Sequence, residues 1–124
     1  LFTGPRGCGK NALARELARR TESNVCMTLG ELGSVQVWDG GAAHCPGRPV
    51  EGEIDFCGAG DSFLSGFSLA LAAGADCARA AAFGSLASEV TIQKRGTTGT
   101  ATRREILGWR GLWARRDGEG EEKP

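Results

Sequence analysis

The sequence contains few of the residues that build metal and redox sites. It has one histidine and five cysteines, and no two of the cysteines form a C-x-x-C pair. The usual spacings of a zinc site are therefore excluded. An odd number of thiols without a pairing pattern is typical of reduced cysteines, so we expect a cytoplasmic protein.

Net charge and long apolar runs are also missing. Lysine plus arginine and aspartate plus glutamate number 15 each, so the formal net charge is zero. A balanced charge gives no general attraction to nucleic acid or to an anionic membrane. No stretch approaches the roughly 20 apolar residues that a membrane-spanning helix needs. We expect neither nucleic acid nor a membrane as a partner, whereas a small anionic ligand is compatible with the composition.

The N-terminus lacks the features of a signal peptide. Leu1-Phe2-Thr3 does not begin with methionine, and no charged region followed by an apolar run comes after it. We expect that the chain is truncated at its N-terminus.

Glycine is abundant, with 20 residues placed mostly at junctions between patterned segments. Leu13 and Leu17 predict an amphipathic helix over residues 12–20, with Asn11 as its N-cap. Asp39-Gly40-Gly41 is typical of a hairpin turn. Strands are expected at Val25–Thr28, at Ser34–Trp38 and, with two prolines that favour an edge position, at His44–Val50.

The second half of the chain predicts helices. Apolar residues from Phe63 to Leu71 indicate a helix that ends near Gly74. Asp76 is expected to cap a second, alanine-rich helix that runs to about Glu89. Together with the strands before them, these helices predict an α/β protein.

The C-terminal region divides into a last helix and a tail. Thr102 followed by Glu105 forms a capping-box pattern at the start of a helix. From residue 115 the chain is charged and rich in glycine, which is typical of a solvated, disordered segment. We expect one structured part at residues 1–114 and a tail at 115–124.

Gly58-Ala59-Gly60-Asp61 combines features that phosphoryl transfer requires. Two glycines let the backbone approach a ligand closely, and the start of the following helix offers unpaired N–H groups and a positive dipole. Asp61 adds a carboxylate that can accept the proton of a substrate hydroxyl. The alternative is structural, because aspartate is favoured near a helix start by capping and by the dipole alone.

Three motifs strengthen the phosphoryl-transfer interpretation. Residues 55–63, read as D-F-C-G-A-G-D-S-F, resemble the D-T-x-G-A-G-D-x-F signature of ribokinase-like (PfkB) carbohydrate kinases. Residues 28–33 resemble the T-L-G-x-x-G nucleotide turn of that family, and residues 85–96 resemble its adenine-side helix and the Lys/Arg-Gly-Thr loop after it. The motifs occur in the family's order, and the resemblance covers about residues 22–107.

The resemblance implies a role for each matching residue. Asp61 would be the catalytic base, and the amides of Gly58, Ala59 and Gly60 would form the anion hole. The expected cofactors are ATP and Mg²⁺, and a monovalent cation such as K⁺. The nucleotide would contact Thr28, Gly30, Glu31, Gly33 and Ser85, and the monovalent cation would lie at the loop of Asp55, Cys57, Thr91 and Gly96.

The resemblance also implies a fold and partners. The family's fold is a three-layer α/β/α sandwich around a parallel sheet, of which this chain would hold only the C-terminal part. The substrate would be a sugar or sugar phosphate, and a homodimer would form through the missing N-terminal part. Three residues depart from the pattern: Phe56 replaces the usual threonine, Cys57 occupies a position that is often threonine or valine, and Ser85 stands where many members have asparagine.

Two other functions remain as alternatives. The chain could be a truncated, non-catalytic remnant of such a kinase that binds nucleotide only. The segment Gly4–Lys10 also fits the P-loop pattern G-x-x-x-x-G-K, although Asn11 follows where serine or threonine would bind Mg²⁺. No apolar run ending in aspartate follows at a suitable distance, so a small P-loop NTPase is the less favoured alternative.

Overall fold

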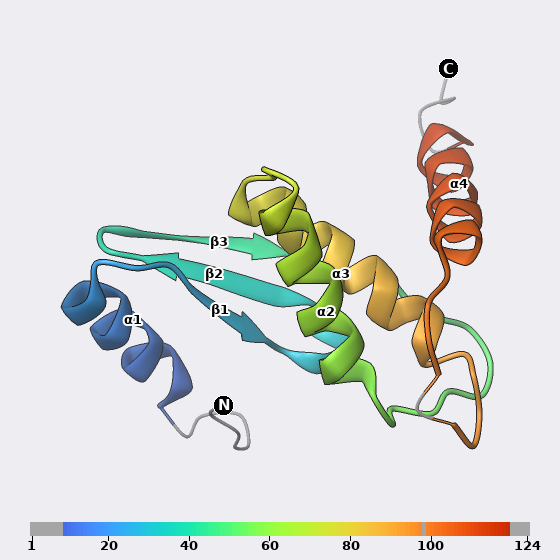
Figure 1. Cartoon of the computed structure of the whole chain (residues 1–124), viewed down its shortest axis with the longest axis horizontal. Coiled ribbons are helices and arrows are strands. Elements are labelled where there is room, and N and C mark those ends of the chain that lie inside the picture. Colours follow the sequence, from blue (N-terminus) through green and yellow to red (C-terminus); the bar gives the residue numbers. More distant parts are fainter. Residues whose placement is uncertain (1–8, 98, 120–124) are drawn as a thin grey trace.

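A computed structural model describes residues 9–97 and 99–119 of the chain (Figure 1). Within these residues, three strands follow the first helix, and three further α-helices follow the strands. The strands are β1 (Val25–Thr28), β2 (Ser34–Trp38) and β3 (Gly41–Cys45), with a 3₁₀ turn at Gly30–Leu32. The helices are α1 (Lys10–Thr21), α2 (Ala59–Ala72), α3 (Cys77–Thr91) and α4 (Arg103–Glu119).

The three strands form an antiparallel sheet in the order β1-β2-β3. Successive side chains of a strand point to opposite faces. On one face, Val35 and Val37 of β2 pack against Ala14 and Ala18 of α1. On the other face, which α3 covers, β2 places the buried Ser34 and Gln36. The sheet therefore lies between α1 and the α2–α3 pair, as Figure 1 shows.

Helices α2 and α3 pack closely because glycines lie where they meet. A Cβ added to Gly66 of α2 would stand 3.1 Å from the Cα of Gly84 in α3. The hydroxyl of Thr91, which is fully buried, lies 2.9 Å from the hydroxyl of Ser62 and adds a polar link between the helices. A separate apolar cluster joins α3 to α4 through Val90 and Ile106.

Several expectations from the sequence are confirmed. β1 and β2 have the expected bounds. Asp76 caps α3, its carboxylate accepting a hydrogen bond from the amide of Arg79 at 2.8 Å. Thr102 and Glu105 form the capping box at α4, with Thr102 N donating to the Glu105 carboxylate at 2.8 Å and Glu105 N donating to Thr102 Oγ1 at 3.3 Å.

Three expectations about element bounds were wrong. Asn11 is not the N-cap of α1, because Gly9, with φ of 85°, occupies that position and Asn11 lies inside the helix. The third strand is Gly41–Cys45 rather than His44–Val50, since Asp39-Gly40 closes a two-residue turn and β3 pairs with β2 directly after it.

The remaining correction concerns the tail. Helix α4 continues to Glu119, beyond the boundary at residue 115 where a disordered tail was expected, and residues 120–124 lie outside the described part. The described strands all pair antiparallel. Within the described residues, no helix is long and apolar enough to cross a membrane.

Candidate active site

The start of α2 presents unpaired amides beside a carboxylate. Gly58 precedes the helix with φ of 78°, a left-handed conformation that glycine adopts without steric cost. Of the three amides expected in the anion hole, that of Ala59 already donates to the carbonyl of Phe56 at 3.1 Å. Within the described residues, the amides of Gly60 and Asp61 have no protein acceptor. An anion bound here would meet these two N–H groups and the positive end of α2.

Asp61 lies in the first turn of α2 with its side chain exposed to solvent. The adjacent Ser62 is tied to α3 through Thr91. The backbone that carries Asp61 is therefore fixed, while its carboxylate is accessible to a substrate. This combination suits a general base, which needs a defined position and access to the proton it accepts.

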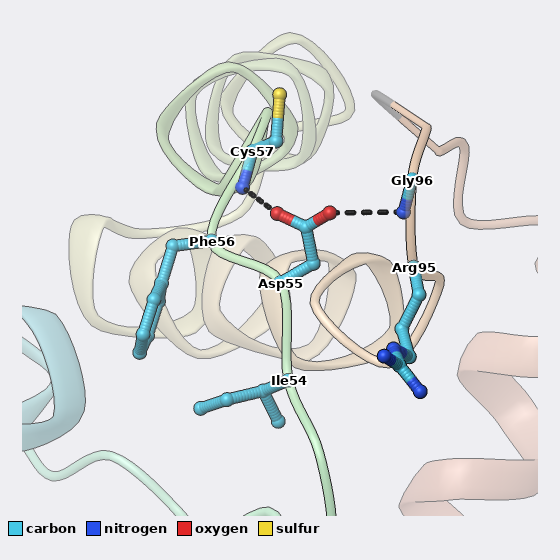
Figure 2. Close-up of a pocket in the computed structure, with 6 residues that line it drawn as sticks. All are labelled: Ile54, Asp55, Phe56, Cys57, Arg95 and Gly96. Atoms are coloured by element: carbon cyan, nitrogen blue, oxygen red, sulfur yellow. Dashed lines mark hydrogen bonds between the residues drawn. The ribbon is translucent and has the colours of Figure 1, made fainter.

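Asp55 joins the segment before α2 to the loop after α3. Its Oδ1 accepts from the amide of Cys57 and its Oδ2 from the amide of Gly96, both at 2.9 Å (Figure 2). Its own amide donates to the carbonyl of Ile92 at 2.8 Å. The two backbone donors, that of Cys57 first, hold the pKa of the Asp55 carboxyl below its usual value.

The expected monovalent-cation residues are only partly brought together. Asp55, Cys57 and Gly96 line one shallow surface hollow, together with Arg95, whose guanidinium forms an ion pair with Glu53. Thr91 lies apart from it, fully buried at the end of α3, and its carbonyl accepts from the amide of Lys94 at 2.9 Å. Within the described residues, no group of three His, Cys, Asp or Glu side chains could hold a metal ion.

A second cavity, of about 510 Å³, unites segments that are distant in the sequence. It is lined by the turn after β1, by the start of α2 and by one face of α3. All the residues expected at the nucleotide lie here, as do two of the three residues expected at the anion hole. These are Thr28, Gly30, Glu31, Gly33, Ser85, Ala59 and Gly60.

Close backbone contact shapes one wall of this cavity. Gly33 ends the 3₁₀ turn with φ of 92°, and Leu29 N donates to its carbonyl at 2.7 Å. A Cβ on Gly33 would overlap the carbonyl oxygen of Cys45 and the backbone nitrogen of Gly47. A Cβ on Gly47 would in turn overlap the carbonyl oxygen of Glu31. The turn and the segment after β3 can therefore meet only through two glycines.

Sequence reasoning missed Glu89, which also lines the cavity and is 7% exposed. Its carboxylate accepts from the indole N–H of Trp109 at 2.6 Å and from the amide of Arg48 at 3.3 Å. Burial raises the pKa of Glu89, and the two hydrogen bonds oppose that rise. A signal was available, since Glu89 is an isolated charge in an otherwise small and apolar stretch, four residues after Ser85. Gly47 and Arg48 gave no comparable signal.

The P-loop hypothesis falls mostly outside the described residues. Gly9 and Lys10 start α1, and residues 4–8 lie outside the part that the structure describes. Because α1 packs on the opposite face of the sheet from α3, Lys10 belongs to a different layer from the residues around Asp61.

A model of the pfkB family of carbohydrate kinases matches residues 9–104 of the chain. The match includes the turn after β1, the start of α2 and the loop after α3. The chain therefore belongs to the pfkB carbohydrate kinase family.

Similar proteins and structures agree with this assignment. The chain is 37% identical over 82 residues to fructoselysine 6-kinase of Escherichia coli (strain K12), a match that covers 66% of the chain and 31% of that relative. It therefore spans about a third of the length of this curated relative.

Solved structures show the same fold. A nucleoside kinase of Burkholderia thailandensis in complex with inosine is 30% identical, with a TM-score of 0.68 over 80% of this chain and 34% of that one. A ribokinase of Thermotoga maritima is 25% identical, with a TM-score of 0.69 over 78% of this chain and 34% of that one. The chain thus has part of the ribokinase-like α/β fold, as the sequence predicted.

Proposed function

We propose that this chain carries the nucleotide-binding and catalytic part of a kinase that transfers phosphate from ATP to a hydroxyl of a sugar or sugar phosphate. One observation carries the proposal beyond family membership. The turn after β1, the start of α2 and one face of α3 line a single cavity, whose volume of about 510 Å³ falls in the range of small-ligand sites.

The lining of the cavity suits the parts of a nucleotide. Ile54, Phe56 and Ile92 offer apolar surface to a purine, and Ser85 offers it a hydroxyl. The amides of Gly60 and Asp61 lie at the α2 end, where a phosphoryl group would meet the helix dipole. We therefore orient the nucleotide with its base along α3 and its phosphates towards the start of α2.

Asp61 would act as the general base. Its carboxylate takes the proton of the substrate hydroxyl while the hydroxyl oxygen forms a bond to the γ-phosphorus of ATP. The bond between that phosphorus and the bridging oxygen of ADP breaks, and ADP leaves. The unpaired amides of α2 stabilise the negative charge on the transferring group, which is the main demand of this reaction.

Cations would complete the site. Mg²⁺ commonly keeps several waters and is held through substrate phosphates, so it needs no dedicated protein cage. It would neutralise charge on the phosphates of ATP. A monovalent cation such as K⁺ would use oxygens of the loop around Asp55, Cys57 and Gly96, where the Asp55 carboxylate supplies a hard, charged donor.

Calorimetric titration of the chain with ATP·Mg²⁺ tests the nucleotide site. Gly60 lines the cavity, and a Cβ added there meets no atom within 4 Å, so we expect Gly60→Val to abolish binding without disturbing the fold. Gly108→Val is the matched control, because Gly108 lies in α4 with equally open surroundings. A folded chain that binds no ATP, or a Gly60→Val variant that binds as wild type does, would refute the proposed site.

The same titration separates the alternatives. A non-catalytic remnant would bind ATP but release no ADP with any of a panel of sugars and sugar phosphates. A P-loop NTPase would lose ATP binding in Lys10→Ala and keep it in Gly60→Val.

A further inference from the structure

Glu89 is a buried carboxylate that the proposed reaction does not use. It lies on the cavity face of α3 together with Ser85 and Ser88, which line the same space. Only 7% of the residue is exposed, and burial of a carboxylate costs free energy unless hydrogen bonds compensate for the lost water. Its presence therefore needs a reason beyond packing.

The carboxylate connects two segments that are distant in the sequence. Its Oε2 accepts from the indole N–H of Trp109 in α4 at 2.6 Å, and its Oε1 accepts from the amide of Arg48 at 3.3 Å. Arg48 belongs to the segment between β3 and α2. One acceptor group thus holds both α4 and a wall of the cavity.

The Arg48 contact reaches the nucleotide turn through backbone packing. Gly47, next in the chain to Arg48, lies so close to the turn that a Cβ would overlap the carbonyl oxygen of Glu31. Glu31 and Gly33 of that turn line the cavity. A shift of Arg48 would therefore move Gly47 and, with it, the turn.

We propose that Glu89 is a positioning residue for the nucleotide, fixing the cavity wall through Arg48 and taking its own position from Trp109 of α4. The proposal rests on the proposed function, because it assigns a role within the same cavity. It makes α4 a determinant of affinity for the base-bearing half of the nucleotide. The phosphate end at α2 is held separately, by the amides of Gly60 and Asp61.

Two variants and two ligands test this role in the full chain. Glu89→Gln has a single oxygen acceptor for two N–H donors, and Trp109→Phe removes the indole donor while keeping the carboxylate. Trp38→Phe is the matched control, because Trp38 lies at the far end of β2 and does not line the cavity. Each protein is titrated with ATP·Mg²⁺ and with tripolyphosphate·Mg²⁺, well below its measured melting temperature.

We expect Glu89→Gln to raise the Kd for ATP about tenfold, the equivalent of one hydrogen bond to a charged group, and Trp109→Phe to raise it less. The Kd for tripolyphosphate should not change in either variant, and Trp38→Phe should match wild type throughout. A purely structural role would lower the melting temperature and leave both Kd values unchanged, which would overturn the proposal.

Other outcomes are equally decisive. Equal weakening of ATP and tripolyphosphate would show that Glu89 supports the whole site rather than its base end, and would also overturn the proposal. If Glu89→Gln does not fold, the ATP affinity of Trp109→Phe decides alone. If wild type binds neither ligand, the proposed function itself fails and this inference fails with it.

Discussion

Helices α2 and α3 pack against each other and have 14 and 15 residues, yet their first turns are built differently. At α3 the side chain of Asp76 accepts from the amide of Arg79. At α2 the residue before the helix is Gly58, no side chain caps the end, and the amides of Gly60 and Asp61 have no acceptor among the described residues. A side chain thus caps α3, whereas α2 begins after a left-handed glycine without a side-chain cap and places its open amides at the candidate site.

Helices α4 and α1 extend this comparison. At α4, Thr102 and Glu105 form a reciprocal capping box, so two of the four described α-helices are capped by side chains, while α1 and α2 each follow a left-handed glycine without one. Glycine in place of a capping side chain costs only roughly a few tenths of a kcal/mol. What distinguishes the open end of α2 from that of α1 is the carboxylate of Asp61 in its first turn and its place at the cavity.

The largest effect on the rate should come from substitution of Asp61, the acid in the first turn of α2. Asp61→Asn keeps the shape of the side chain and removes the base, so we expect the rate of sugar-dependent ADP release to fall by about 10²–10⁴-fold. ATP affinity should change little, since the proposed phosphate contacts are backbone amides. The rate of ADP release and the Kd for ATP, measured on the same preparation, test both statements.

The matching change at the start of α3 provides the control. Asp76→Asn retains a capping oxygen, and Asp76 lies at the other end of α3 from Ile92, which lines the cavity. Its rate should equal that of wild type. If the two substitutions lower the rate equally, Asp61 has no special role and the difference between the helix ends is only structural.

A smaller effect is expected from the glycine before α2. Gly58 has φ of 78°, so Gly58→Ala forces a side chain into the left-handed region at a cost of about 1–2 kcal/mol. It should also displace the adjacent amides and weaken ATP binding. Urea unfolding and titration with ATP·Mg²⁺ measure the two effects.

Gly60→Ala is the control for Gly58→Ala, because it replaces a glycine whose backbone is not in the left-handed region. Gly60 lies inside the helix, its φ is not positive, and an added Cβ meets no atom within 4 Å. Stability should stay the same or rise, because alanine is the better helix former. Equal destabilisation by both alanine variants would argue against a strained turn at Gly58.

At the start of α3, removal of the Asp76 cap should change the free energy of unfolding and leave ATP binding unchanged. Asp76→Ala leaves the amide of Arg79 without its acceptor and should lower the free energy of unfolding by about 1 kcal/mol. The ion pair between these residues is exposed and adds little. A drop in ATP affinity as large as that of Gly58→Ala would show that the two helix ends are not independent.

Local signals in the sequence were sufficient for much of the fold and the site. The capping residues Asp76, Thr102 and Glu105 bond to partners only a few residues away, so the amino-acid sequence alone reveals their patterns. The Asp39-Gly40 turn was also recognised, but the register it imposes, which starts β3 at Gly41, was not. Asn11 was misjudged because glycine at position 9 can also begin a helix.

The parts of the site that escaped prediction depend on contacts distant in the sequence. The partners of Glu89 are Arg48 and Trp109, 41 and 20 residues away, and no local pattern links them. The fit of Gly47 against Glu31 likewise depends on two segments meeting in space. The resemblance of the motifs predicted that the nucleotide turn and α2 belong to one site. The cavity wall around Gly47 and Arg48 could be identified only from the structure.

The smallest effect we predict concerns the charge in the α4 cap. Glu105 accepts from Thr102 and from Lys94, and these contacts, the Thr102 amide first, lower its pKa from 4.5 to about 2. A carboxyl whose pKa is lower in the folded state stabilises the fold above its unfolded pKa, and this contribution is lost as the pH falls from about 4.5 towards 2. Glu105→Gln should therefore flatten the dependence of unfolding free energy on pH in that window. Glu16, whose pKa is also about 2 through Arg19 and Arg20, will leave a residual slope that Glu16→Gln removes. Parallel curves for wild type and Glu105→Gln would mean that the α4 cap works through hydrogen bonds without a contribution from charge.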